Sequence, residues 1–479
     1  MILKTGLYNH QIKATEKLRS IKVGALYMEM GTGKTRTALE LIRIRLDAGK
    51  INKVLWLCPC SVKENLRRDL LKHCDDISNI YICGIETLSR SIRTNTKLLE
   101  LVKENSIFLI VDESNLVKNH AAKRTQNIER LAEYCRYKLI LNGTPISKSE
   151  KDLFAQWYIL DWRILGYQSF WSFAANHLEY DKNIPGKVNK CLNTDYLVRK
   201  IAPYTYQVKK SECLDLPDKT YSVKYFFLSN EQEAEYDRVK ELFLSDVNEF
   251  DETTIYRMLS AMQSVISGNR IISELHKRIQ YELMFKDPLD NPRIQCLLNY
   301  VDTDEKTIIF CKYTDEIKTI EKILNNIYGV GSAVTFYGEL NQKQRQKNLD
   351  LFKTTSNFLI ANKQCGAYGL NLQFCCYIIY YSNDWDYATR SQSEDRVHRI
   401  GQNKNVHIVD ICAANKLDER ILNCLARKEN LVDSFKKEIE AQKDKKYLDL
   451  WLSGKTLHGK RYRKKVVNEF EELKEEIQN

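Results

Sequence analysis

The 479-residue sequence contains 14 cysteines but no C-x-x-C pair. Zinc sites use paired ligands at fixed spacing, and disulfide scaffolds are short secreted chains, so the sequence favours buried free thiols in a reducing environment. The N-terminus carries no apolar signal segment, and the longest apolar run, Phe374–Tyr381, is too short to cross a bilayer. There is also no low-complexity stretch and no internal repeat. We therefore expect an intracellular, cytoplasmic protein with no membrane partner.

The composition is that of an ordinary globular protein with a modest positive charge. Hydrophobic residues make up 43% of the chain and charged residues 29%, which argues against wholesale disorder. The length allows two or three domains with large cores. The 74 basic and 63 acidic residues give a net charge of +11. This excess suits a polyanionic partner but does not identify one.

Strand-like and helical segments alternate in the first part of the chain. The run Arg36–Leu46 is predicted to be a helix, and four apolar runs are predicted to be strands: Val23–Met28, Lys53–Leu57, Ser106–Val111 and Lys138–Leu141. This alternation predicts a parallel sheet, whose strand ends on the carboxyl side collect ligands.

The middle of the chain, from about 146 to 290, is predicted to be largely helical. A strand at Val223–Leu228 interrupts it, and a helix then begins at the capping sequence Ser229–Gln232. Alternation resumes at Thr307–Phe310, Asn357–Ala361 and Cys376–Tyr381. The sequence thus predicts an α/β fold with two parallel-sheet lobes, helical insertions between them and a helical C-terminal tail.

The tail combines a basic cluster with an acidic amphipathic helix. The cluster contains five cations between 460 and 465, and an apolar stripe at helical spacing follows it: Val466, Phe470, Leu473 and Ile477. We expect this stripe to dock on a lobe or on a protein partner.

A glycine-rich loop between the first predicted strand and helix is typical of a phosphate cradle. Glycines let backbone N–H groups approach a triphosphate closely. Lys34 would reach the β- and γ-phosphates, and the Thr35 hydroxyl would hold Mg²⁺. The leading glycine of the usual pattern is Met28 here, and the alternative is a structural glycine turn. We assign ATP binding to the loop and its flank: Gly31, Thr32, Gly33, Lys34, Thr35 and Arg36.

An acidic pair follows the apolar strand Ser106–Val111. Asp112 suits a magnesium contact, and Glu113 suits orienting and deprotonating the attacking water. Such a pair at a strand end is otherwise an ordinary turn, and the neighbouring phosphate loop favours catalysis.

Gln392, Arg396 and Arg399 lie at i, i+4 and i+7, which predicts that they share one face of a helix. Positive charge from a second lobe would stabilise the leaving γ-phosphoryl group, as an arginine finger does. The alternative is a solvated helix in which Glu394 and Asp395 balance the arginines.

The order of these motifs resembles helicase superfamily two, and within it the Swi/Snf-type DNA-dependent ATPases. The resemblance spans nearly the whole chain. Its most specific part is the ending Arg399-Ile400-Gly401-Gln402, which differs from that of DEAD-type RNA helicases. The other matching segments are Leu7–Gln11, Cys58–Ser61 with Asn65, Glu86–Leu88, Asp112–Asn115, Leu141–Ile146, Lys209–Lys210, Leu216–Lys219, Ile308–Phe310, Tyr337–Gly338, Gln344–Arg345, Gly369–Leu372 and Trp385.

The resemblance implies roles for these segments. Gln11 would read adenine, and Thr87, Thr144 and Asn371 would hold the DNA backbone without sequence choice. Trp385 would press on a base or pack in the core. Two positions depart from the family: Asn115 replaces a common histidine, and Asn142 replaces threonine or serine. Both positions help to link hydrolysis to movement, so these departures bear on coupling more than on hydrolysis.

The resemblance also implies two RecA-like lobes. We expect an N-terminal ATP-binding lobe at 1–222 with a helical part from about 146, a helical insertion at 223–290, a C-terminal lobe at 291–435, and the tail at 436–479. No further module is expected, which suggests a stand-alone member similar to bacterial or phage proteins.

We expect a motor that uses ATP and Mg²⁺ to move on duplex DNA and to remodel bound protein or branched DNA. Two alternatives stay open: a strand-separating DNA helicase, and an ATP-gated DNA clamp with weak turnover.

Overall fold

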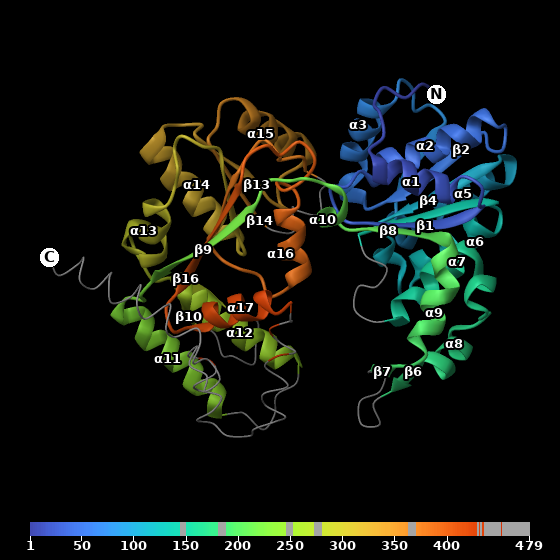
Figure 1. Ribbon diagram of the computed structural model, residues 1–479. Helices are drawn as coiled ribbons and strands as arrows, with labels where there is room; N and C mark the ends of the chain where they lie inside the picture. Colours follow the sequence, from blue (N-terminus) through green and yellow to red (C-terminus); the bar gives the residue numbers. More distant parts are fainter. Residues whose placement is uncertain are drawn as a thin grey trace. The chain divides into compact units, whose positions relative to one another are not determined.

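The structure, a computed structural model, describes residues 1–143, 150–180, 188–245, 252–272, 280–362 and 370–428, with Leu431, Ser434 and Leu452. Its Cα packing divides the chain into two units (Figure 1). The first unit comprises Met1–Leu216, Ala367–Gln373 and His398–Asn403. The second comprises Pro217–Gly366, Phe374–Val397 and Lys404–Asn479.

A six-stranded parallel sheet forms the first unit, in the order β3-β2-β4-β5-β1-β8. Its strands are β1 (Val23–Met28), β2 (Lys53–Cys58), β3 (Ile80–Gly84), β4 (Ile107–Asp112), β5 (Tyr137–Asn142) and β8 (Thr205–Val208). The four strands predicted here are confirmed to within one residue at either end. Helical pieces join these strands, as a parallel sheet requires.

Helices cover both faces of this sheet, which is why its strands read as unbroken apolar runs. In β1, Ala25 and Tyr27 face one core cluster, while Leu26 and Met28 face another. The second cluster is covered by α1 (Asn9–Leu18), α2 (Lys34–Asp47) and α3 (Lys63–His73). The first is covered by α4 (Thr87–Arg90), α5 (Ile92–Glu104), α6 (Lys123–Glu133), α7 (Leu153–Leu165), α8 (Phe170–His177) and α9 (Thr194–Ile201). A two-stranded hairpin, β6 (Leu178–Tyr180) and β7 (Val188–Cys191), lies between α8 and α9, and α10 (Lys210–Cys213) follows β8.

The second unit is also a six-stranded parallel sheet, in the order β13-β14-β12-β15-β16-β9. Its strands are β9 (Lys219–Phe226), β12 (Thr307–Cys311), β13 (Ala333–Phe336), β14 (Phe358–Asn362), β15 (Tyr377–Tyr380) and β16 (Val406–Ala413). The helices are α11 (Asn230–Ser245), α12 (Glu252–Ile266), α13 (Pro292–Asn299), α14 (Thr314–Tyr328), α15 (Gln342–Thr354), α16 (Tyr387–Glu394) and α17 (Leu417–Ala426), with a small β10 (Asn269–Ile271) and β11 (Tyr281–Leu283) pair. Two RecA-like parallel sheets with added helices confirm the predicted fold class.

Strand β9 changes the domain limits expected from the sequence. The strand interrupting the helical region runs over Lys219–Phe226 rather than 223–228, and it pairs with β16 along its whole length. The second unit therefore begins at Pro217, and the expected limit at 222 lies inside it. Helices α11 and α12 pack into the core of this unit instead of forming a separate insertion.

The predicted capping sequence before α11 is confirmed. The backbone N–H of Gln232 donates to Ser229 Oγ at 3.2 Å, and that of Ser229 donates to Gln232 Oε1 at 3.1 Å. These two bonds satisfy amides that the first turn of a helix leaves without partners.

The described cysteines are free thiols, most of them buried, and Cys60 is exposed. No helix in the described part of the chain is long and apolar enough to span a membrane. The basic cluster and the acidic stripe expected in the tail lie outside the described residues.

Candidate functional site

The loop between β1 and α2 has the backbone conformation that a phosphate cradle needs. Gly31 and Gly33 adopt positive φ angles of 83° and 89°, which L side chains rarely adopt. A Cβ added at Gly33 would lie 2.1 Å from Gln11 Nε2, and one added at Gly31 would lie 2.8 Å from Arg399 Cβ. Gly31 is therefore required by close approach as well as by conformation, and Gly33 is required by its conformation.

Two side chains from α1 hold this loop from behind. His10 Nε2 and Gln11 Nε2 both donate to the carbonyl oxygen of Thr32, at 2.8 and 3.1 Å. The Thr32 hydroxyl in turn donates to the Glu29 carbonyl at 2.7 Å. The predicted adenine-reading residue thus lies directly at the phosphate loop. His10 was missed, although it stands beside Gln11 in the same sequence match.

Lys34 begins α2, and its Nζ donates to the carbonyl oxygen of Met28 at 2.9 Å. Asp112 lies at the end of β4, close enough for the Lys34 charge to act on it. Burial and the neighbouring Glu113 raise the pKa of Asp112 to about 7, and Lys34 offsets this only in part. A divalent cation at this point would favour the ionised carboxylate, so the donor set fits Mg²⁺.

Glu113 has a φ of 50°, an uncommon conformation for a residue with a side chain. Its backbone N–H donates to Asp112 Oδ1 at 2.9 Å, which closes the strand end into a tight turn. Strain of this kind is often found at functional sites, and here it sets the direction of a candidate catalytic carboxylate.

The structure shows Arg36 in contacts within the protein, and its predicted contact with ATP stays a prediction. Its guanidinium donates to the Thr5 carbonyl at 2.7 Å and to Glu40 at 3.0 Å, and the residue is buried. The side chain therefore ties the N-terminal segment to α2, to which Glu40 belongs. Sequence reasoning missed the contact with Thr5 because the two residues are 31 positions apart.

The prediction that Gln392, Arg396 and Arg399 share a helical face is wrong. Helix α16 ends at Glu394, so only Gln392 is helical. The next two backbone bonds, from Arg396 to Ser393 and from Val397 to Glu394, span three residues and tighten the chain into turns. Arg399 belongs to the first unit together with the phosphate loop, whereas Gln392 and Arg396 belong to the second.

Lys210 fastens the segment around Arg399. Its backbone N–H donates to Glu29 Oε2 at 2.8 Å, and its Nζ donates to the His398 carbonyl at 2.8 Å. Arg399 itself donates to Asn371 Oδ1. Sequence reasoning placed Lys210 in the link between lobes, and the structure adds this contact.

The first two segments predicted to contact DNA meet at the carboxyl ends of β2 and β3. The Cys60 N–H donates to Glu86 Oε2 at 2.8 Å, and Cys60 Sγ lies 3.4 Å from Thr87 Oγ1. Asn371 is exposed. Thr144 lies outside the described residues.

Trp385 lies in the core of the second unit and does not form a surface platform. It is 6% exposed, and its Nε1 donates to Gln263 Oε1 at 2.9 Å. Lys312 Nζ sits 3.6 Å from the centre of its ring. Of the two roles considered for Trp385, packing is the one that the structure supports.

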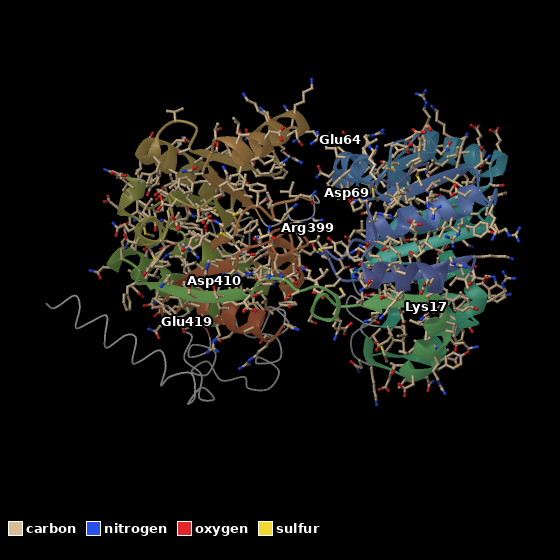
Figure 2. The ribbon with its side chains drawn as sticks, turned by 45° about the horizontal axis from the view of Figure 1, so that its top comes forward. Lys17, Glu64, Asp69, Arg399, Asp410 and Glu419 are labelled. Carbon is tan, nitrogen blue, oxygen red and sulfur yellow. The ribbon has the colours of Figure 1, made fainter. Side chains whose placement is uncertain are left out.

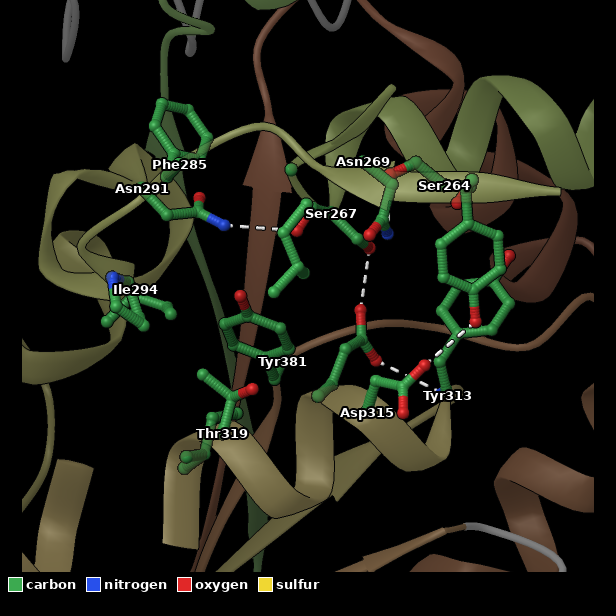
Figure 3. A pocket seen from close by; sticks show the side chains of 16 residues that line it. Ser264, Ser267, Asn269, Phe285, Asn291, Ile294, Tyr313, Asp315, Thr319 and Tyr381 are labelled. Carbon is green, nitrogen blue, oxygen red and sulfur yellow. Dashed lines mark hydrogen bonds between the residues drawn. The ribbon is translucent and has the colours of Figure 1, made fainter. Parts of the chain in front are cut away.

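A separate hollow lies in the second unit (Figure 3). About 610 Å³ of empty space, continuous with solvent, is bordered by β10, β11 and the start of α14. The Tyr281 hydroxyl donates to Asp315 at its edge, and Ser267 donates to Glu316 inside it. None of the residues predicted to bind ATP, Mg²⁺ or DNA lines this hollow.

Comparison with known proteins matches two successive domain families. The SNF2-related domain matches residues 76–280, and the helicase conserved C-terminal domain matches residues 292–401. The chain therefore contains an SNF2-related domain followed by a helicase conserved C-terminal domain.

Similar proteins include bacterial chains named as uncharacterized ATP-dependent helicases. An uncharacterized ATP-dependent helicase of Mycoplasma pneumoniae is 24% identical over 89% of this chain, which spans 42% of that relative. An uncharacterized ATP-dependent helicase of Bacillus subtilis is 24% identical over 90% of this chain and 80% of its own length. A solved SWI2/SNF2 ATPase core of Sulfolobus solfataricus, in complex with double-stranded DNA, is 22% identical, with 94% of this chain and 96% of that chain covered and a TM-score of 0.41.

The two domains indicate an ATP-hydrolysing enzyme.

The two departures from the family pattern have different local consequences. Asn142 Oδ1 accepts from the Gly143 N–H at 2.9 Å, so this side chain closes its own turn. Asn115 Oδ1 is buried and has no hydrogen-bond partner among the described residues. A buried acceptor without a partner is costly, so Asn115 marks a position that the described contacts leave unsatisfied.

Proposed function

We propose that the protein is a DNA-stimulated ATPase that moves along duplex DNA. The observation that carries this proposal is the gathering of the predicted nucleotide residues in one unit. Gln11 contacts the phosphate loop, the acidic turn lies near Lys34, and Arg399 approaches Gly31. Binding, positioning and charge stabilisation are the main contributions that proteins make to phosphoryl transfer.

Each residue has a separate part in the proposed hydrolysis. The loop amides and Lys34 bind the phosphates, and Glu113 accepts the proton of the attacking water at its carboxylate. Arg399 adds positive charge where the γ-phosphoryl group leaves. Thr35 and Asp112 would hold Mg²⁺, which would supply further neutralisation of the phosphate charge.

DNA is the proposed partner because SNF2-related domains resemble DNA-dependent motors and the chain carries a charge of +11. The adjoining turns at Cys60 and Thr87 offer polar groups at one edge of a sheet, as backbone-holding segments do. We propose that this binding is independent of sequence and takes place inside the cell. The tail remains a proposed site for a protein partner.

The weak-turnover clamp is the second candidate. The unpartnered Asn115 oxygen and the Asn142 turn lie at the two positions that help to couple hydrolysis to movement in the resemblance. A protein with poor coupling would bind DNA in an ATP-dependent way without sustained stepping.

Steady-state ATP hydrolysis separates these candidates. We expect duplex DNA to raise kcat strongly, single strands to raise it less, and RNA to leave it near the basal rate. Glu113→Gln serves as the control for contaminating ATPases. Equal rates with duplex DNA, with single strands, with RNA and without nucleic acid would argue against a DNA-driven motor and for the clamp.

Movement is tested by strand displacement. A translocase that keeps the duplex closed should strip the third strand from a DNA triplex while leaving a plain forked duplex paired. Both substrates are assayed at the same salt and enzyme concentration, because non-specific binding can trap displaced strands. Efficient opening of the fork without triplex displacement would favour the strand-separating helicase.

A further inference from the structure

The chain crosses from one unit to the other at several points. One ion pair links two residues that lie next to two of these crossings. One passage lies between Leu216 and Pro217, and another lies between Val397 and His398. Lys219 begins β9 just after the first passage, and Glu394 ends α16 just before the second. Lys219 Nζ lies 2.9 Å from Glu394 Oε2, within the second unit.

This ion pair is part of a partly buried hydrogen-bonded chain. Arg390 Nε donates to Glu394 Oε1 at 2.8 Å, and the Tyr221 hydroxyl donates to Glu394 Oε2 at 2.8 Å. The side chains of Arg390 and Glu394 are each 7% exposed. Burial opposes the charge of Glu394, but Arg390 and Lys219 outweigh it and hold the pKa of the carboxyl below its usual range.

Arg390 anchors the chain in the sheet. It forms a bidentate pair with Asp410 of β16, at 2.6 and 3.0 Å, and donates to Asn383 at 2.7 Å (Figure 2 labels Asp410). Its guanidinium carbon also lies 3.4 Å from the centre of the Tyr380 ring. Bidentate pairing of this kind fixes geometry as well as energy. Glu394 is therefore held against a rigid strand.

Glu394 occupies an intrinsically poor position, because a carboxylate at a helix C-terminus meets the negative end of the helix dipole. Two cations compensate for this, and only one of them, Arg390, comes from the same helix. The other, Lys219, comes from the strand that follows the passage at Leu216. The C-terminal end of α16 is consequently stabilised by Lys219, the first residue of β9.

We propose that the Lys219–Glu394 ion pair is a positioning device for the segment that carries Arg396 and Arg399. The pair fixes the point at which α16 stops, and the turns after Glu394 lead directly to both arginines. Lys219 and Glu394 are thus positioning residues, acting through the arginines rather than on the nucleotide. This inference rests on the proposed ATPase function.

The test is a double-mutant cycle on ATP hydrolysis with Lys219→Met, Glu394→Gln and the double variant. Each single change should lower kcat about tenfold with little change in KM, because the arginines lose position rather than contact. The double variant should be about as slow as Glu394→Gln alone, since both single changes break the same Lys219–Glu394 pair. Lys219→Arg should recover most of the rate because it keeps the charge.

A matched control is Lys318→Met, which removes a 3.0 Å pair with Glu339 elsewhere in the same unit. It should leave kcat unchanged. Hydrogen exchange of the nucleotide-free protein gives a second readout. Amides of residues 395–402 should exchange faster in Lys219→Met and Glu394→Gln, while β12 keeps its protection.

Wild-type kcat in Lys219→Met, or losses that multiply in the double variant, would overturn the inference. If Glu394→Gln does not fold, Lys219→Met alone decides, because Lys219 is the more exposed partner at 23%. A wild-type protein without ATPase activity would instead refute the proposed function, and unchanged exchange at 395–402 would refute the positioning role by itself.

Discussion

The two units share six parallel strands with helices on their flanks, but they use charge differently. In the second unit, two buried arginines each pair with a buried carboxylate. Arg293 and Asp418 lie 3.0 Å apart with side chains 1% and 4% exposed, and Arg390 and Asp410 form a second pair. In the first unit, Asp112 and Glu113 lie side by side at a strand end, and burial together with Glu113 raises the pKa of Asp112.

This difference separates charges that hold a fold from charges that await a ligand. In a buried ion pair each charge is compensated by the other, so removing one partner lowers the free energy of unfolding. Adjacent carboxylates repel each other until a cation binds, so removing one of them lowers activity but makes the folded protein more stable. The comparison therefore predicts that removing the buried Arg293 makes the protein less stable, whereas removing the charge of Asp112 makes it more stable.

The largest expected effect is on catalysis. Glu113→Gln should lower kcat by roughly 10³-fold or more, because it removes the base and leaves the cradle intact. Nucleotide binding, measured with a fluorescent ATP analogue, should stay close to wild type. Lys34→Ala should weaken both binding and turnover. Hydrolysis by Glu113→Gln at the wild-type rate would show that the acidic turn is not catalytic.

Arg399→Ala should lower kcat about a thousandfold, as expected for an arginine that acts on the leaving phosphoryl group. Nucleotide affinity should change far less than the rate. Single-turnover kinetics measure the rate of hydrolysis separately from nucleotide affinity. A variant within about threefold of wild type would mean that Arg399 serves only its bond to Asn371.

In the second unit, Arg293→Met should lower the free energy of unfolding by about 3–5 kcal/mol, because Asp418 would stay buried without its partner. Urea unfolding of the variant measures this. The double change Arg293→Met/Asp418→Leu should recover part of the loss. Equal instability of the single and double variants would indicate that Arg293 acts through its bond to the Tyr381 carbonyl, at 2.7 Å, instead.

The smallest expected effect is a gain in stability on replacing Asp112, opposite in sign to the loss expected for Arg293→Met. Its folded pKa, about 7, lies above the value of an unfolded aspartate, so this carboxyl makes the folded state less stable as pH rises from about 4 to 7. Asp112→Asn should therefore raise the Tm of the metal-free protein by a few degrees at pH 8 and by less at pH 5. Calorimetry at the two pH values checks this. A lower Tm at pH 8 would contradict the comparison.

Local patterns predicted most of the first unit from sequence alone. Apolar runs located β1, β2, β4 and β5, because strands buried on both faces must be continuous and apolar. The same runs placed the phosphate loop and the acidic turn at strand ends. These signals need no knowledge of distant residues.

Where the structure departs from the sequence patterns or adds to them, partners far away in the sequence take part. Helical spacing suggested one face for Gln392, Arg396 and Arg399, but α16 ends at Glu394, which pairs with Lys219 of β9. Trp385 contacts Gln263 and Lys312, and Arg36 contacts Thr5. A one-dimensional pattern contains no trace of such pairings.

The position of Cys60 makes the protein convenient for optical measurement. Among the described cysteines it is the exposed one, and its sulfur lies beside Thr87 at the edge proposed to hold the DNA backbone. A maleimide dye on this thiol would sit at that edge and report DNA arrival as a change in fluorescence. Cys191 and Cys213 are partly exposed, so a labelling variant would replace them with serine first. The native thiol thus offers a way to time DNA binding separately from ATP turnover.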